Sequence, residues 1–394
     1  MLGISVLDAA KRRISETFDR FQRICVSFSG GKDSTCMLHL VMEEAISRSR
    51  KVDLVFIDWE AQYKLVIDHV KECFDLYADH VIPHWICSPL RTENGGSMID
   101  PEWTSWEPGK EAIWVRGKPA GSISEFPFHY DGIYFEEFVP EFSKWLAGGE
   151  DMAVFVGIRC GESLHRWSAV MGKNKERVSG IPYSTKISSN VFNIYPIYDW
   201  VAEDDWTYLG QSGKCYSRLY DRMYQAGVPL EKMRVCEPYG PYQRRGLWLF
   251  QIIEPETWPA VVARVSGANY AALYAKDRGG ILGHGVIEKP ARFTWKEYAR
   301  FLLDTMPPSH VLHYENKIAV WVKWHKDRGV EISEELRGDT GRDMPSWRRV
   351  CKVILHNDYW CRGLSFGPTK TSAYGKYLDL MKRRRVEWGS GVGI

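Results

Sequence analysis

Several features that would assign the chain to common protein classes are scarce or absent. No apolar run approaches the roughly 18 residues that a membrane-spanning helix needs, and residues 1–13 lack the uninterrupted apolar core of a signal peptide. The formal net charge is only +2, so the chain as a whole has no electrostatic preference for nucleic acid. These absences predict a cytoplasmic protein that does not span a membrane.

The cysteines are also not arranged as in disulfide-rich or iron–sulfur proteins. Nine cysteines are scattered along 394 residues, and neither a C-x-x-C pair nor a Cys-Gly-x-His tetrapeptide occurs. No disulfide framework is expected, in keeping with a reducing cytoplasm. Cys351, His356 and Cys361 are evenly spaced, but ordinary buried cysteines are the simpler interpretation, and we predict no structural metal.

The most informative stretch is V-S-F-S-G-G-K-D-S at residues 26–34. An apolar run at 24–28 ends in small residues, and a helical apolar pattern follows, which predicts a strand, a tight loop and a helix. Glycines let the backbone approach an anion, and the first turn of a helix offers free N–H groups, so the loop suits a pyrophosphate group. Its candidate binding residues are Ser27, Ser29, Gly30, Gly31, Lys32, Asp33 and Ser34.

Asp33 is the unexpected member of this loop. A carboxylate repels phosphate unless a cation lies between them, so we predict that Asp33 binds Mg²⁺. Lys32 supplies a mobile positive charge. The P-loop motif G-x-x-x-x-G-K-[ST] is rejected, because Val26 occupies its first glycine position and Asp33 follows the lysine. A capped helix N-terminus without a ligand is the simpler alternative.

Residues 1–240 alternate strands with helices. Buried strands are expected at 52–57, 80–86, 153–158 and 191–197, and Pro83 marks an edge strand. The alternation predicts an α/β fold with a doubly wound, five-stranded parallel sheet that binds ligands at the carboxyl ends of its strands. Asp58 follows one such strand, where we expect it to contact the ribose or adenine. Arg159 and Arg166 follow another, where they could clamp a phosphate or sulfate.

Two regions depart from this alternation. Residues 88–149 are rich in glycine, proline and tryptophan and predict a long irregular insertion ending in a helix near 136–146. A lid, a partner-binding element and a plain surface excursion are all consistent with it. Residues 241–394 predict a mainly helical C-terminal module. Its basic tetrad at 382–385 suggests nucleic-acid contact, but a solvated helix end is the favoured reading.

These motifs resemble those of a known superfamily. S-G-G-K-D-S is similar to the S-G-G-x-D-S signature of PP-loop ATP pyrophosphatases. Gly157-Ile158-Arg159 followed by Glu162-Ser163 resembles the G-[IL]-R-x-x-E-S element of their phosphoadenosine phosphosulfate (PAPS) reductase-like branch. Segments 194–206 and 216–221 resemble later motifs of that branch. The resemblance implies an adenine nucleotide α-hydrolase-like fold and cleavage of ATP between its α and β phosphates.

The same resemblance suggests roles for individual residues. Lys32, Asp33 and Arg159 are the candidate catalytic residues. The nucleotide, ATP or a PAPS-like molecule, would be bound by the loop residues together with Asp58, Gly157, Arg159, Glu162, Ser163 and Arg166.

Three functions stay open on the sequence alone. The favoured one is ATP-dependent adenylation of an unidentified acceptor. A PAPS or adenylyl-sulfate reductase would need a redox cysteine, for which Cys236 is the candidate, and a non-catalytic regulator would bind ATP without turnover. The C-terminal extension, with N-D-Y-W-C at 357–361, resembles the immunoglobulin-binding regulator A-type subgroup. That subgroup implies a ParB-like, sulfiredoxin-like protein partner and a role in transcription regulation or phage defence.

Overall fold

The computed structural model describes residues 4–97, 99–172, 175–240, 246–269, 272, 287–334, 345–356, 358–364 and 368–387. The chain forms two compact units, the first comprising residues 1–272 and 384–394 and the second residues 273–383. The boundary expected at 240/241 therefore falls inside the first unit. The reason is that Leu247 and Phe250 are buried in the hydrophobic core of that unit.

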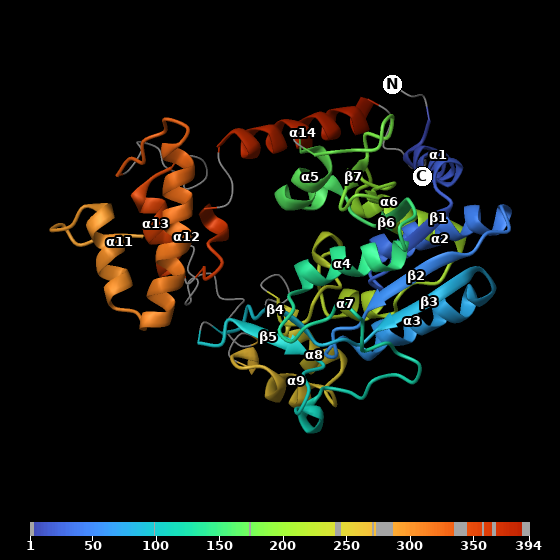
Figure 1. Cartoon of the computed structure of the whole chain (residues 1–394), viewed down its shortest axis with the longest axis horizontal. Coiled ribbons are helices and arrows are strands. Elements are labelled where there is room, and N and C mark those ends of the chain that lie inside the picture. Colours follow the sequence, from blue (N-terminus) through green and yellow to red (C-terminus); the bar gives the residue numbers. More distant parts are fainter. Residues whose placement is uncertain are drawn as a thin grey trace. The chain divides into compact units, whose positions relative to one another are not determined.

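The first unit contains a six-stranded sheet with the strand order β3-β2-β1-β6-β8-β7 (Figure 1). Its strands are β1 (Arg23–Ser27), β2 (Val52–Ile57), β3 (Val81–Ile86), β6 (Met152–Val156), β7 (Ser184–Lys186) and β8 (Val191–Ile194). All except β7 run parallel, which confirms the predicted doubly wound sheet. The short strand β7 was not expected and adds an antiparallel edge. Pro83 lies on β3, at the other edge, as predicted.

The helices of the first unit fix where the sheet can bind a ligand. They are α1 (Val6–Arg20), α2 (Lys32–Ser47), α3 (Lys64–Leu76), α4 (Phe135–Ala147), α5 (Leu164–Met171), α6 (Ala202–Ser212), α7 (Leu219–Gln225), α8 (Trp248–Ile253) and α9 (Trp258–Arg264). The chain passes through α2 and α3 as it moves from β1 to β3, and returns through α4 to β6 on the other side of β1. Because such crossovers are right-handed, α4 covers the opposite face from α2 and α3. The strand order reverses between β1 and β6, where doubly wound folds bind ligands.

The insertion at 88–149 contains more regular structure than the sequence indicated. Strands β4 (Leu90–Glu93) and β5 (Glu102–Ser105) form an antiparallel hairpin. The expected helix corresponds to α4, which carries an aromatic cluster: the ring centroid of Phe126 lies 5.3 Å from that of Phe138 and 5.5 Å from that of Phe142. Buried aromatic packing therefore holds this part of the insertion in place.

The described part of the second unit is mainly helical, in agreement with the predicted C-terminal module. Its helices are α11 (Trp295–Asp304), α12 (Pro308–Lys326), α13 (Trp347–Leu355) and α14 (Pro368–Glu387), whose last residues belong to the first unit. A capping box at Thr294 begins α11. Cys351 is buried in the core of the unit and donates a hydrogen bond to the Trp295 carbonyl at 3.1 Å.

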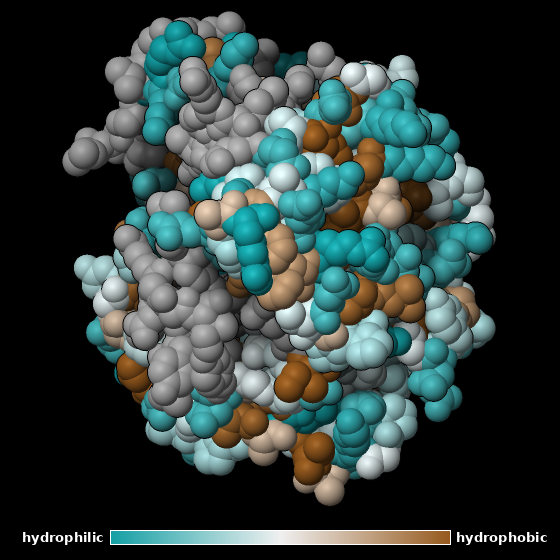
Figure 2. All heavy atoms as spheres, turned by 90° about the vertical axis from the view of Figure 1, so that its left-hand side faces the viewer, coloured by the Kyte–Doolittle hydropathy of each residue, from teal (hydrophilic) through white to brown (hydrophobic). Residues whose placement is uncertain are grey.

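No helix in the described ranges combines the length and the apolar character needed to cross a membrane. Hydrophilic and hydrophobic residues are interspersed on the face drawn in Figure 2.

A buried ion pair joins α1 to the segment that follows β8. Arg13 donates hydrogen bonds to the two carboxylate oxygens of Asp199, at 2.8 and 2.6 Å, and to the Pro196 carbonyl at 2.7 Å. Its guanidinium also lies over the Tyr198 ring, 4.6 Å from the centroid. Because both charged groups are largely removed from water, loss of either one would leave the other unpaired.

We expect Arg13→Ala to lower the free energy of unfolding by about 3 kcal/mol, the usual cost of removing one partner of a buried ion pair. Urea denaturation followed by tryptophan fluorescence measures this change. Arg12→Ala is the matched control, because the neighbouring arginine forms an exposed pair with Glu16 that is worth only about 0.4 kcal/mol. Equal losses of unfolding free energy in the two variants would contradict a stabilising role for the Arg13–Asp199 pair.

Candidate functional site

Two loops meet where the strand order reverses. Ser27 at the end of β1 pairs with Val156 at the end of β6, so the residues that follow each strand lie side by side. Gly157 comes directly after β6. A Cβ atom placed on it would lie only 2.9 Å from the N and Cα atoms of Ser34 in the first turn of α2. Only glycine fits between β6 and this turn.

The loop between β1 and α2 is held by its own hydroxyl groups and by α3. The hydroxyls of Ser29 and Ser34 lie 2.9 Å apart, and that of Ser34 donates to the Gly31 carbonyl at 2.9 Å. Gly30 has a φ of +71°, and a Cβ on it would lie 2.8 Å from Cγ1 of Val66 on α3. Both its backbone conformation and its surroundings therefore require glycine.

Four charged side chains meet at the start of α2. Lys32 Nζ lies 2.9 Å from Asp33 Oδ1 and 3.7 Å from Asp205 Oδ2. Arg159 Nε lies 2.7 and 3.3 Å from the same two oxygens. Lys32, Arg159 and Asp205 are buried, Asp205 completely. Each carboxyl group thus faces both cations.

The two carboxyl groups of this cluster differ in their pKa shifts. Burial by itself would raise the pKa of Asp33, but the neighbouring Asp205 carboxyl and the charges of Lys32 and Arg159 together lower it well below its usual range. Burial, and then the negative charge of Asp33, raise the pKa of Asp205 well above its usual range. The upward shift favours the neutral form of Asp205, in which Lys32 and Arg159 face a single carboxylate and suit an anionic ligand.

Asp205 and Tyr220 belong to the site, although neither was among the predicted site residues. Asp205 lies in the first turn of α6, whereas the adjacent Asp204 pairs with Arg385 at 2.6 Å. Tyr220 on α7 accepts a hydrogen bond from the backbone N–H of Lys32 at 2.8 Å, and burial raises the pKa of its hydroxyl. Both residues lie in segments 194–206 and 216–221, which resemble motifs of the PAPS reductase-like branch. That resemblance did not show which residues of the segments face the loop.

Glu162, Ser163 and Arg166 lie together where α5 begins. Ser163 caps the helix by accepting a hydrogen bond from the Arg166 N–H at 3.2 Å. The Arg166 guanidinium pairs with Glu162 Oε2 at 2.7 Å, and Arg234 lies 3.7 Å from the other carboxylate oxygen. These contacts account for the local structure of the turn, and the role of the three residues in nucleotide binding stays a prediction.

Asp58 is buried at the end of β2 and already has several partners. Its Oδ2 accepts a hydrogen bond from Trp85 Nε1 at 2.8 Å, and its Oδ1 accepts one from the Glu60 N–H at 2.9 Å. The same Oδ1 pairs with Arg116 of the insertion. Asp58 thus ties the insertion to the sheet, and its predicted contact with a ribose or adenine stays a prediction.

Cys236 follows Val235, which lies beside the loop between β1 and α2. A Cβ placed on Gly31 would lie 3.6 Å from Cβ of Val235. Burial, and then the nearby charge of Glu237, raise the pKa of the Cys236 thiol to about 12. A thiol with this pKa is almost entirely protonated at neutral pH and is a poor nucleophile.

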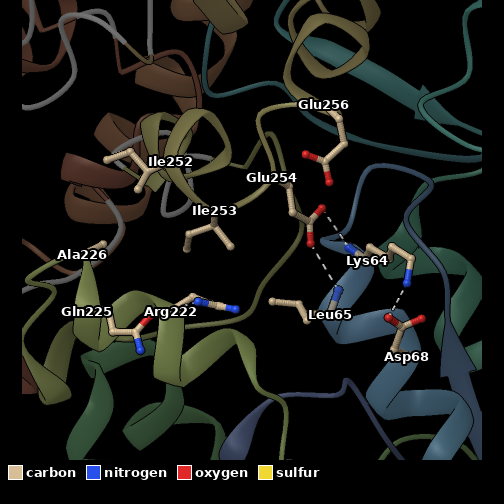
Figure 3. Close-up of a pocket in the computed structure, with 10 residues that line it drawn as sticks. All are labelled: Lys64, Leu65, Asp68, Arg222, Gln225, Ala226, Ile252, Ile253, Glu254 and Glu256. Carbon is tan, nitrogen blue, oxygen red and sulfur yellow. Dashed lines mark hydrogen bonds and ion pairs between the residues drawn. The ribbon is translucent and has the colours of Figure 1, made fainter.

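A pocket of about 350 Å³ lies elsewhere on the first unit, lined by residues of α3, α7 and α8 and by Glu254 and Glu256 (Figure 3). Glu254 accepts hydrogen bonds from the backbone N–H groups of Lys64 and Leu65, at 3.0 and 3.2 Å. It therefore satisfies the first amides of α3, which have no partner within the helix. In the described part of the chain, the lining includes no residue of the loop at 29–34, so this pocket is separate from the candidate site.

Two family models match the chain. Residues 138–226 match the phosphoadenosine phosphosulfate reductase domain, which confirms the predicted resemblance to PAPS reductase-like proteins. Residues 227–340 and 330–374 match a domain of unknown function, DUF3440. The immunoglobulin-binding regulator A-type subgroup stays a prediction.

Two curated proteins are similar in sequence. YbdN, an uncharacterized protein of Escherichia coli (strain K12), is 45% identical over 395 aligned positions, which cover 98% of this chain and 97% of YbdN. The uncharacterized protein MJ0973 of Methanocaldococcus jannaschii is 25% identical over 228 positions, which cover 55% of this chain and 44% of MJ0973.

Similar solved structures include PAPS reductase from Candida auris in a phosphate complex, with 17% identity and a TM-score of 0.32 over 54% of this chain and 84% of that chain. Candida glabrata FMN adenylyltransferase in complex with ATP has 16% identity and a TM-score of 0.34 over 55% and 57% of the two chains. Likenesses of this size carry no conclusion about activity.

Gly157→Ala tests the close contact between β6 and α2. We expect a loss of about 1–3 kcal/mol in the free energy of unfolding, because the added methyl group overlaps the backbone of Ser34. Gly161→Ala in the same loop is the matched control, since a Cβ there meets no described atom within 4 Å. Urea denaturation measures both variants. A Gly157→Ala protein as stable as Gly161→Ala would contradict the contact.

Proposed function

We propose that this chain, which belongs to the protein family of Escherichia coli YbdN, binds ATP at residues 29–34 and transfers its adenylyl group to an acceptor. The observation that carries the proposal is the position of this glycine-rich loop. It joins β1 to the first turn of α2 at the point where the strand order reverses, and Arg159 reaches it from the end of β6. A helix N-terminus with such a loop and an excess of positive charge favours a pyrophosphate group.

Lys32 and Arg159 are the cations available to the phosphates. Both face Asp33 and Asp205, so a nucleotide must take over part of these interactions. The upward pKa shift of Asp205 favours its neutral form, and a neutral carboxyl group attracts the cations less than a carboxylate does. We assign Lys32 and Arg159 to the stabilisation of negative charge that develops on the phosphoryl oxygens in the transition state.

Asp33 and Asp205 fit a divalent cation. Both oxygens of Asp205 are buried and have no hydrogen-bond partner in the described part of the chain, and paired carboxyl oxygens are ligands that Mg²⁺ prefers. We therefore assign Asp205, together with the predicted Asp33, as the residues that would hold Mg²⁺, with Asp205 releasing its proton when the ion binds. When bound, the ion would offset the negative charge of the β and γ phosphates.

In the proposed reaction, a nucleophilic atom of the acceptor forms a bond to the α phosphorus of ATP. The bond from that phosphorus to the oxygen bridging the α and β phosphates breaks, the acceptor loses its proton, and pyrophosphate leaves. The loop would hold the β and γ phosphates so that the leaving group lies in line with the attacking atom. Pyrophosphate would be the product retained by the loop.

Lys32→Ala and Asp33→Asn test this mechanism. We expect each to reduce pyrophosphate release from ATP by at least about 100-fold, because each removes a charge that acts on the phosphoryl group. A coupled pyrophosphate assay measures turnover, and circular dichroism checks the fold. Lys144→Ala is the control, since that lysine is exposed on α4.

Near wild-type release by either Lys32→Ala or Asp33→Asn would contradict the mechanism. If the wild-type protein binds ATP in a calorimeter but releases no pyrophosphate, the chain is instead a nucleotide-gated regulator.

The match of residues 138–226 to a PAPS reductase domain favours a second candidate, reduction of PAPS or adenylyl sulfate. A cysteine thiolate would attack the sulfur, displace the nucleotide phosphate, and release sulfite when a dithiol reductant breaks the resulting bond. The raised pKa of Cys236 argues against this role.

We expect Cys236→Ser to leave pyrophosphate release within about twofold of wild type, because a thiol with a pKa raised to about 12 supplies almost no thiolate at neutral pH. The same pyrophosphate assay measures it, beside a sulfite assay with PAPS and a dithiol reductant. Sulfite release by the wild type that is lost in Cys236→Ser would establish the reductase instead.

The ParB-like, sulfiredoxin-like partner, the part played by nucleic acid, and the role in transcription regulation or phage defence stay predictions from the resemblance. These predictions can be tested by incubating the protein with ATP, Mg²⁺ and nucleic acid, with and without the partner. Mass spectrometry of the products would identify the acceptor and show whether the partner or nucleic acid is required.

A further inference from the structure

Four side chains that bind soft metal ions converge within the first unit. His39 lies on α2, His69 and Cys73 lie on α3, and Cys215 lies between α6 and α7. One donor atom from each of His69, Cys73 and Cys215 lies within 4.8 Å of the other two. The two sulfur atoms are 4.0 Å apart, and Cys215 Sγ lies 3.9 Å from His39 Nε2.

We propose that His69, Cys73 and Cys215 bind a zinc ion, with His39 as the fourth ligand. Zinc lies about 2.3 Å from sulfur and about 2.0–2.1 Å from nitrogen, so neighbouring ligand atoms of a tetrahedral site are roughly 3.3–3.8 Å apart. The sulfur–sulfur distance here is 4.0 Å, and Cys73 Sγ lies 3.7 and 3.9 Å from the two ring nitrogens of His69. His39 Nε2 now lies 2.8 Å from the Cys215 carbonyl oxygen, so zinc binding would exchange that hydrogen bond for a metal bond, with small rotations of the other side chains.

Local structure explains why these side chains converge. His69 and Cys73 are four residues apart on α3, so they lie on one face of the helix. The hydroxyl of Tyr77 lies 2.7 Å from His39 Nδ1, and that of Thr35 lies 3.0 Å from His69 Nε2. Hydrogen bonds of this kind orient the rings of metal-binding histidines.

The donor set favours zinc over other metals. Two thiolates and two imidazoles in a compact arrangement are typical of tetrahedral zinc, whereas Mg²⁺ and Ca²⁺ prefer oxygen ligands. An iron–sulfur cluster distributes its four ligands over two or more iron atoms, which requires more space than three donor atoms within 4.8 Å of one another provide. The site thus fits a single ion.

A zinc ion here would connect elements that shape the loop at 29–34. α2 begins at Lys32, Val66 of α3 lies against Gly30, and Cys215 precedes α7, whose Tyr220 binds the Lys32 N–H. The ion would brace these elements without contacting the nucleotide. The sequence indicated no such site, because its ligands come from three separate segments.

The test is the zinc content of the full-length protein, purified without chelators and measured by mass spectrometry of the elements. We expect about one zinc per chain in the wild type and below about a tenth of that in Cys73→Ser and Cys215→Ser. Cys87→Ser is the matched control and should retain its zinc, because Cys87 is also buried but lies outside the cluster.

Because loss of zinc can unfold the variants, a second measurement uses the wild type loaded with Co²⁺. Tetrahedral thiolate ligation should give intense visible d–d bands and a charge-transfer band in the near ultraviolet. Absence of both zinc and these bands, equal zinc in all cysteine variants, or a Cys73–Cys215 disulfide in protein purified under reducing conditions would each overturn the proposal. None of these readouts depends on ATP cleavage.

Discussion

The close approach of β6 to the first turn of α2 is the contact on which the candidate site depends. Gly157 leaves no room for a side chain, since a Cβ there would lie 2.9 Å from the backbone of Ser34. Because the chain can pass this close, Arg159 reaches Asp33 with a separation of 2.7 Å between Nε and Oδ1. A bulkier residue at 157 would separate the two loops and weaken a charge interaction whose strength falls with distance.

The four charged side chains at this contact contribute little to the stability of the fold, but they are well placed to bind a charged ligand. Removing four ionisable groups from water is costly, and the attraction between buried charges often does no more than offset that cost. Here the raised pKa of Asp205 favours the neutral form of one carboxyl group, in which the cations are less than fully compensated. An anion and a metal ion bound at the cluster would offset the cost of burying its charged groups. The cost of this burial is therefore consistent with the proposed nucleotide site.

The insertion is fixed to the sheet at the carboxyl end of β2. Glu60 follows β2 and accepts hydrogen bonds from Arg264 at 2.6 and 3.1 Å and from the Trp106 N–H at 2.7 Å. Arg116 pairs with Asp58 next to it. These buried polar contacts are inside one compact unit, and they favour a fixed wall over a lid that opens for each turnover.

The sequence by itself determined the alternating strands and helices apart from β4, β5 and β7, the edge position of Pro83, and the grouping of Lys32, Asp33 and Arg159, because periodicity and strand ends are local properties of the chain. The tertiary structure alone decided that Asp205, and not Asp204, faces the loop, since adjacent helical residues point about 100° apart and only packing fixes the rotation of α6. It also decided that His39, His69, Cys73 and Cys215 converge. Spacing along a chain does not report distances between packed helices.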